Sequence, residues 1–282
     1  MAEKGLWLYD NTLWRTGAAL TASSAALPVA RLLDYRPGRK WRATGKAAEW
    51  IHVDHGDDVD IDTIFLYAGN FGLGDTVRIR ISANSDMSSP VYDQTVEVWE
   101  PVYGYGVNFG LNYGGYPNLT DFAAFTQRRL IRLGAVYSKR YLRIDFAAPD
   151  NGDTYVEAGI VMAGIGYQPS RNFLFGWDVD HDDPSDQEET DGGSVLITAR
   201  PSARVLNVTM GNLPLDEALT QVDDMKRIVG RKRPLLFVPF PDGDVSRIYR
   251  TSIYGVVKAW QPIRHTSPLR ASGAAMTIRE LA

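Results

Sequence analysis

A short segment indicates the architecture of the first half of the chain: Glu49-Trp50-Ile51-His52-Val53-Asp54-His55-Gly56. Apolar and polar residues alternate along it, and the alternation stops at a glycine, which is typical of a half-buried β-strand that ends in a turn. A second alternating run, Ile61–Tyr67, follows directly. The sequence therefore predicts two successive strands, each with one face on a hydrophobic core.

The same pattern recurs up to about residue 168. Three apolar side chains of Thr76–Ser82 share one face of a strand and two arginines share the other. Gly, Asn and Asp separate the strands, as turns require, and many short strands of this kind predict a β-sandwich. One short helix is predicted over Leu119–Leu133. The predicted strands are Gly5–Tyr9, Trp50–Asp54, Thr63–Ala68, Thr76–Ser82, Thr95–Trp99, Lys139–Phe146 and Glu157–Tyr167.

The order of these features resembles the discoidin-like jelly roll, also called the galactose-binding-like or F5/8 type C domain. A loop from Asp34 to Trp41 comes first, then Trp-x-x-Val-Asp-x-Gly at 50–56, then a hydrophobic strand. The resemblance implies a jelly-roll domain over residues 1–168 that serves recognition or assembly, with any ligand on the end loops. We interpret Trp41 and Trp50 as packing residues and Asp54 as a partner of turn amides, with sugar stacking as the alternative.

The pattern changes after Gln168–Asn172, which has the composition of a domain junction. An amphipathic helix is predicted over Leu215–Val229, capped by Asn212 or Asp216 and closed by Gly230. The predicted strands of this half are Phe173–Val179, Ser194–Ala199, Arg204–Met210, Pro234–Phe240, Arg247–Val257 and Ala275–Leu281. The whole chain is thus predicted to be mainly β, an N-terminal sandwich followed by a β domain with one helix.

The second half, residues 173–282, resembles the ring domain of tailed-bacteriophage distal tail and tail-tube-like proteins. The resemblance is carried by Gly176-Trp177-Asp178-Val179, by Ala203–Val208, by the helix ending at Gly230, and by Pro234–Pro239 and Ile253–Val257. It implies a homohexameric ring that contacts a tail tube protein on one side and a hub or fibre protein on the other. In familiar distal tail proteins the ring domain comes first, whereas here the sandwich comes first, so the tail component stays open.

Composition excludes several classes. The net charge of −4 offers no basic field for sequence-specific nucleic-acid binding. The chain has no cysteine, so neither a disulfide nor a thiolate metal site can stabilise it. The stretch from Ala18 to Leu33 is too short and too polar to span a bilayer, and we expect no membrane insertion. No cofactor motif is present, so we expect no cofactor.

A loop rich in aromatic residues and glycine is the binding candidate. Rings provide large contact area at small entropic cost, and glycines give the loop freedom. The sequence predicts either a protein–protein interface or a glycan platform here, while the alternative is an insertion whose rings cover the sandwich. The candidate residues are Trp99, Tyr103, Tyr105, Phe109, Tyr113 and Tyr116.

An acidic segment is a weaker candidate for a metal site. Asp183 occupies the position at which an EF-hand loop needs glycine, and Pro184 follows it, so we favour a solvated loop and expect no metal. The residues at positions 1, 3, 5 and 12 of such a loop are Asp178, Asp180, Asp182 and Glu189.

We therefore expect a protein that is not an enzyme. No nucleophile elbow, phosphate-binding loop or zinc motif is present, and a hydrolase would need a carboxylate pair at catalytic distance in a cleft. The leading hypothesis is a structural virion protein of a phage tail tip, made in the host cytoplasm, whose ring links the tail tube to a hub or fibres. The alternative is a carbohydrate-binding host-recognition module that acts through the Trp99–Tyr116 loop.

Overall fold

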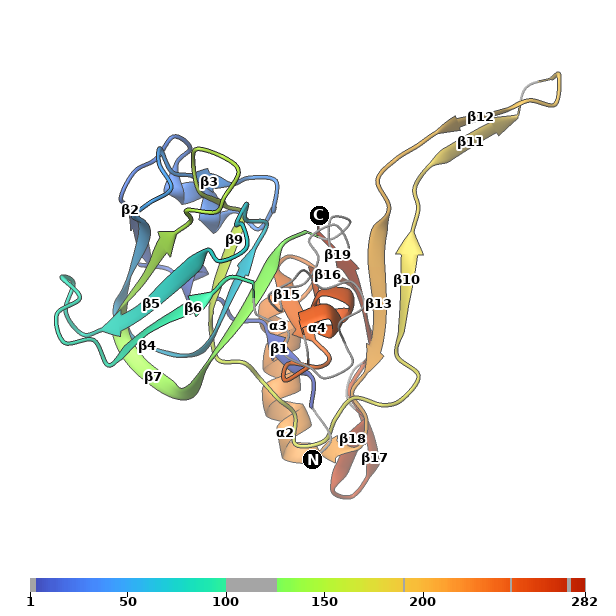
Figure 1. The fold of residues 1–282 in the computed structure, drawn as a ribbon. Coiled ribbons are helices and arrows are strands. Elements are labelled where there is room, and N and C mark those ends of the chain that lie inside the picture. The colour runs from blue at the N-terminus through green and yellow to red at the C-terminus, as the bar shows by residue number, and fades with distance from the viewer. Residues whose placement is uncertain (1–3, 100–125, 190, 244, 273–274, 282) are drawn as a thin grey trace, which may run out of the picture. The chain divides into compact units, whose positions relative to one another are not determined.

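The computed structural model describes residues 4–99, 126–189, 191–243, 245–272 and 275–281, and it is mainly β, as predicted (Figure 1). The chain divides into two compact units. Unit 1 comprises Met1–Tyr9, Gln168–Pro239 and Thr251–Ala282, and unit 2 comprises Asp10–Tyr167 and Phe240–Arg250. The chain passes from unit 2 to unit 1 at Gln168, where the sequence places a junction.

Unit 2 is a sandwich of antiparallel strands. Its main sheet has the order β2-β4-β7-β5-β6, and β9 pairs with the far half of β4. Two short strands, β3 and β8, pair separately. The bounds are β2 Ala19–Ala22, β3 Trp41–Arg42, β4 Glu49–Tyr67, β5 Thr76–Ser82, β6 Tyr92–Glu97, β7 Arg128–Ala147, β8 Glu157–Ala158 and β9 Ile160–Gly164, with short 3-10 helices η1 Thr12–Trp14 and η2 Val29–Leu33.

The two strands predicted around Gly56 are one continuous strand, β4, so the prediction of a turn was wrong. Gly56 has a φ of +83° and its amide donates to the Asp54 carboxylate over 2.8 Å. The register between β4 and β7 shifts between Asp54 and Val59. The glycine therefore bends a long strand through a bulge and does not end it.

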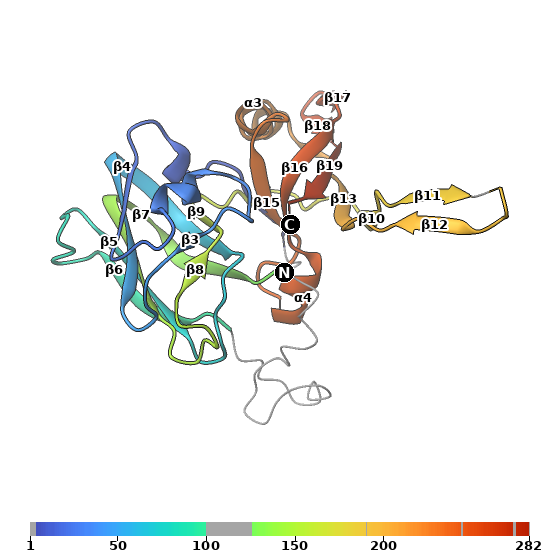
Figure 2. The same ribbon diagram turned by 90° about the horizontal axis from the view of Figure 1, so that it is seen from above.

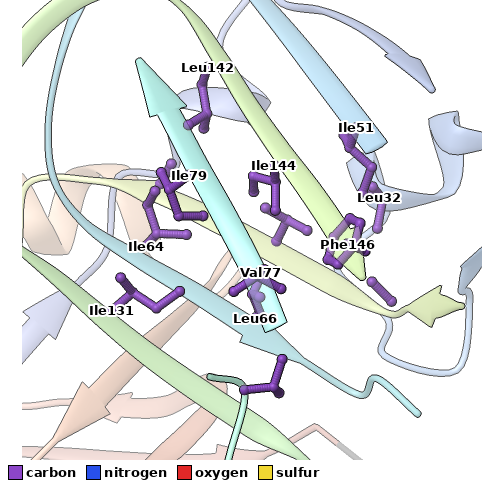
Figure 3. Packing of buried hydrophobic residues seen from close by; sticks show 14 of the residues in the cluster. Leu32, Ile51, Ile64, Leu66, Val77, Ile79, Ile131, Leu142, Ile144 and Phe146 are labelled. Atoms are coloured by element: carbon purple, nitrogen blue, oxygen red, sulfur yellow. The ribbon is translucent and has the colours of Figure 1, made fainter. Parts of the chain in front are cut away.

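The core of unit 2 lies between the inward faces of these strands, as Figure 3 shows. Val77, Ile79 and Ile81 of β5 are fully buried, which confirms the predicted alternation. Trp41 is also fully buried, packs near the Phe146 ring and donates its indole N–H to a backbone carbonyl, so its predicted packing role is confirmed.

The prediction of a helix over Leu119–Leu133 was wrong for residues 126–133, the part of it that the structure describes. Residues 128–133 belong to β7, in which Leu130 and Ile131 pair with Phe65 and Ile64 of β4. Pairing with a distant strand overrides the local helical spacing. The beginning of that prediction, 119–125, lies outside the described residues.

Unit 1 is built on a six-stranded antiparallel sheet of order β1-β15-β16-β19-β13-β10. Strand β1, predicted within the sandwich, instead pairs with β15, and the buried Trp7 ring stacks on Phe237 at 4.4 Å. Two smaller pairings, β11–β12 and β14-β18-β17, complete the unit. The bounds are β1 Leu6–Leu8, β10 Asp178–Asp182, β11 Asp186–Glu189, β12 Val195–Thr198, β13 Ala203–Thr209, β14 Leu213–Pro214, β15 Pro234–Val238, β16 Ile253–Trp260, β17 Arg264–Ser267, β18 Arg270–Ser272 and β19 Ala275–Glu280.

The amphipathic helix predicted over Leu215–Val229 is confirmed. It runs through α2 Leu215–Glu217, a π-helical turn η3 Ala218–Val222 and α3 Asp223–Val229, and it ends at Gly230 with a φ of +52°. The N-cap is Pro214, without a side-chain cap, so the predicted caps Asn212 and Asp216 were wrong. The strand predicted from Arg247 was also partly wrong, because α4 covers Val245–Thr251 and β16 begins at Ile253.

Candidate functional site

The aromatic loop predicted as a binding surface falls almost entirely outside the described residues, so its other members stay a prediction. Trp99 is described and lies in the core of unit 2, 5% exposed. Its ring stacks on Tyr249 of α4 at 5.2 Å, and its indole N–H donates to the Phe71 carbonyl oxygen over 3.0 Å. Trp99 therefore packs the sandwich and presents no free face to a ligand. The undescribed members are Tyr103, Tyr105, Phe109, Tyr113 and Tyr116.

The acidic segment was predicted to be a loop, and this prediction was wrong, because its residues form two exposed strands. Asp178, Asp180 and Asp182 lie in β10, and Glu189 lies in β11. Asp178 accepts a hydrogen bond from Asn207, and Asp182 pairs with Arg279 over 2.9 Å. Across the described ranges, no group of three or more His, Cys, Asp or Glu side chains is placed to hold a metal ion.

The pair β11–β12 extends β10 and β13 beyond the six-stranded sheet of unit 1 (Figures 1 and 2). We call Asp186–Glu189 and Val195–Thr198 the projecting ribbon. Every residue of it is exposed, and Val195, Leu196 and Ile197 are 56, 57 and 64% exposed. An isolated two-stranded hairpin is at best marginally stable in water, and adjacent exposed apolar side chains mark interaction surfaces. The ribbon is therefore a candidate assembly surface.

Unit 2 carries a second candidate surface, an open pocket of about 500 Å³. It forms at a wide bulge: Ile61 pairs with Tyr137 and Thr63 with Arg132, so Asp62 alone lies opposite Leu133–Val136. Bulges re-aim side chains and often occur next to functional sites. The pocket is lined by Asp62, Arg132, Gly134, Ala135, Val136 and Asp242.

The polar groups of this pocket suit a ligand with many hydroxyl groups. The Arg132 guanidinium contacts the Asp242 carboxylate over 2.7 Å, and both side chains are largely exposed. Asp62 is held in place by hydrogen bonds from the Thr63 hydroxyl and the Gly166 amide. Carboxylates accept hydrogen bonds and a guanidinium donates them, so neighbouring hydroxyls can be bound from both sides. No sequence pattern indicates this pocket, because Asp242 lies far along the chain from Arg132.

On the outer face of the unit 2 sheet, arginine side chains form ion pairs with neighbouring aspartates. Arg140 binds both carboxylate oxygens of Asp54, and this partner, followed by the Gly56 amide, lowers the pKa of Asp54 to about 2. Arg143 lies over the Trp50 ring at 4.4 Å and also contacts Asp145. Trp50 thus lies half-buried on the outer face of the sheet, with the Arg143 guanidinium packed over its ring.

His55 lies just before the glycine bend and is 6% exposed. Burial lowers the pKa of His55 to about 4, because the charged imidazolium loses its hydration. The side chain is therefore neutral at physiological pH and acts as part of the core.

No helix in the described part of the chain is long and apolar enough to cross a membrane.

No family model matches the chain, and no curated protein matches it in sequence. Among solved structures, it is similar to CpGH89CBM32-6 produced by Clostridium perfringens, at 14% identity over 56% of this chain and 99% of that one, with a TM-score of 0.34. It is also similar to chitosan-binding module 1 of a chitosanase/glucanase from Paenibacillus sp. IK-5, at 16% identity over 55% and 98%, with a TM-score of 0.35.

The lectin domain of Lectinolysin, complexed with Lewis B antigen, is a further similar structure, at 14% identity over 55% of this chain and 97% of that one, with a TM-score of 0.37. The sandwich architecture of unit 2 rests on its own strand pairing, which has the antiparallel form that the jelly-roll resemblance implies.

Proposed function

We propose that the chain is a structural virion protein whose unit 1 joins other copies in a ring at a phage tail tip, with unit 2 as a jelly roll carried by that ring. The projecting ribbon is the observation that carries the proposal. The tail-tube-like pattern of the sequence supports it and implies six copies, a tail tube protein on one side and a hub or fibre protein on the other. In this function the chain is not an enzyme and resides in the virion tail after synthesis in the host cytoplasm.

The ribbon has the properties of an interface that is completed by assembly. Val195, Leu196 and Ile197 each expose more than half of their surface. Complete burial of such a side chain contributes about 1.5–3 kcal/mol, so covering the exposed part contributes roughly 1 kcal/mol for each. A closed ring repeats this gain at every contact and leaves no ribbon uncovered.

Mass photometry of the full chain over a concentration series tests this function. We expect a discrete closed oligomer, six copies by the resemblance, that is lost in the double variant Leu196→Ser, Ile197→Ser. The control is Leu219→Ser, because Leu219 is an equally exposed leucine on the helix of the same unit. A wild-type chain that stays monomeric at every concentration would contradict the proposal.

A second candidate function, carbohydrate binding by unit 2, is favoured by the pocket at the bulge. Asp62, Arg132 and Asp242 bring acceptors and donors of hydrogen bonds to one open surface, as sugar hydroxyls require. The aromatic loop predicted between Trp99 and Tyr116 is the expected source of stacking rings.

A glycan array followed by calorimetry on the best ligand tests the second function. Arg132→Ala and Asp242→Ala should each weaken binding about tenfold, the usual effect of losing a hydrogen bond to a charged group. Asp58→Ala, an exposed carboxylate on β4 outside the pocket, serves as the matched control. Binding that is unchanged in both pocket variants would exclude this pocket as the sugar site.

A further inference from the structure

Unit 1 carries an excess of unpaired negative charge on and next to the projecting ribbon. Two carboxylates there have partners, Asp182 with Arg279 and Asp186 with Arg200. The others are exposed and form no ion pair with any described residue. These are Asp180, Asp183, Glu188, Glu189 and Asp191. We call this set, together with the ribbon, the acidic ribbon.

The opposite charge collects in one turn of the same unit. Arg231, Lys232 and Arg233 lie between the end of the helix and β15, and all three are exposed. The backbone amides of Lys232 and Arg233 both donate to the Val229 carbonyl oxygen over 3.1 Å, which fixes the turn. Within the described ranges none of the three side chains forms an ion pair. We call Arg231–Arg233 the basic turn.

The topology separates these two surfaces. In the sheet order β1-β15-β16-β19-β13-β10, the acidic ribbon continues from the β10 and β13 side, whereas the basic turn leads into β15 on the other side. A surface that meets a different surface on the next copy makes a heterologous contact, which repeats around a ring when the rotation closes.

We propose that the acidic ribbon of one copy docks against the basic turn of the next copy, head to tail. The proposal rests on the ring function proposed above and names the contact that would build the ring. Opposite charges steer the two surfaces together and fix which surfaces meet, while Leu196 and Ile197 add apolar area to the contact. A symmetric ribbon-to-ribbon pairing is disfavoured, because it would bring the carboxylates of both copies together.

Charge reversal in the full chain tests this contact. A turn variant carries Arg231→Glu, Lys232→Glu and Arg233→Glu, and a ribbon variant carries Glu188→Lys, Glu189→Lys and Asp191→Lys. Each alone places like charges in contact and should weaken self-association at least about tenfold in sedimentation velocity. An equimolar mixture should regain association, because every ribbon then meets a turn of opposite charge.

The control reverses two exposed carboxylates of unit 2, Asp57→Lys and Asp58→Lys, and should associate as the wild type does. Regained association in the mixture also shows that both variants are folded. If the wild type associates but the turn variant and the ribbon variant associate equally well, the proposed contact is wrong and the ring function stands. The same conclusion follows if the wild type associates and the mixture of the two variants does not regain association. A wild type that stays monomeric overturns the ring function and this contact together.

Discussion

The paired strands β4–β7 of unit 2 and β11–β12 of unit 1 are both antiparallel ribbons, but their side chains are covered to very different extents. One face of β4–β7 is buried in the core, and on the other Arg140 and Arg143 bind Asp54 and Asp145. Every residue of β11–β12 is exposed, including a run of apolar side chains. The charges and apolar side chains of β4–β7 are thus matched within the chain, whereas the exposed apolar run of β11–β12 is the basis of the proposed contact between copies.

The largest expected effect comes from removing a core side chain of the β4–β7 pair. Phe146→Ala removes a buried ring of β7. The centroid of this ring lies 5.7 Å from that of the Trp41 ring and 5.6 Å from that of the Phe71 ring. We expect a loss of about 3–5 kcal/mol in the free energy of unfolding, because a cavity remains. Urea denaturation followed by tryptophan fluorescence measures it. A loss below about 1 kcal/mol would show that this core is not tightly packed.

Acidification should weaken unit 2 through His55. The folded pKa of about 4 lies below the ordinary value of 6.5, so the unfolded chain binds the proton first as the pH falls. The titration of His55 therefore leaves the free energy of unfolding unchanged well above pH 6.5. It lowers that free energy as the pH falls from 6.5 to 4, by up to about 3 kcal/mol. Denaturation of the wild type at pH 7.5 and at pH 4.5 measures the decline.

The variant His55→Gln is the matched control for this titration. It removes the ionisable ring and should flatten the dependence in that pH range, whatever its own stability. An equal slope in both proteins would assign the decline to other groups.

The glycine bend offers a smaller effect. Gly56→Ala places a side chain at a φ of +83°, which costs about 1–2 kcal/mol of unfolding free energy through backbone strain. Gly38→Ala is the control, because nothing lies within 4 Å of an added Cβ there and its φ is not in the left-handed region. Thermal unfolding should show a lower midpoint for the first variant and an unchanged midpoint for the second.

Local patterns predicted those elements that local spacing determines. The helix Leu215–Val229 and the strand Thr76–Ser82 were predicted with their observed bounds, because their apolar spacing matches the face that each buries. Glycine was interpreted correctly at Gly230 and wrongly at Gly56, since the same residue permits both a helix end and a bend within a strand.

Elements that depend on distant partners were not predictable in this way. Strand β1 belongs with β15, more than two hundred residues away, and residues 128–133 became a strand through pairing with β4. The pocket likewise needs Arg132 beside Asp242. Trp99 was interpreted as part of a surface loop because a run rich in tyrosine and glycine follows it in the sequence, whereas in the structure its ring stacks on Tyr249.

The smallest expected effect on folding comes from a substitution in the projecting ribbon. Leu196→Ser replaces an exposed side chain, so the free energy of unfolding of the monomer should change by less than about 0.5 kcal/mol. If the proposed ring forms, the substitution should weaken self-association, because the ring contact would cover the apolar area that is lost. Urea denaturation at low protein concentration and sedimentation at high concentration separate the two quantities. A large loss of monomer stability with unchanged association would mean that the ribbon packs against its own chain.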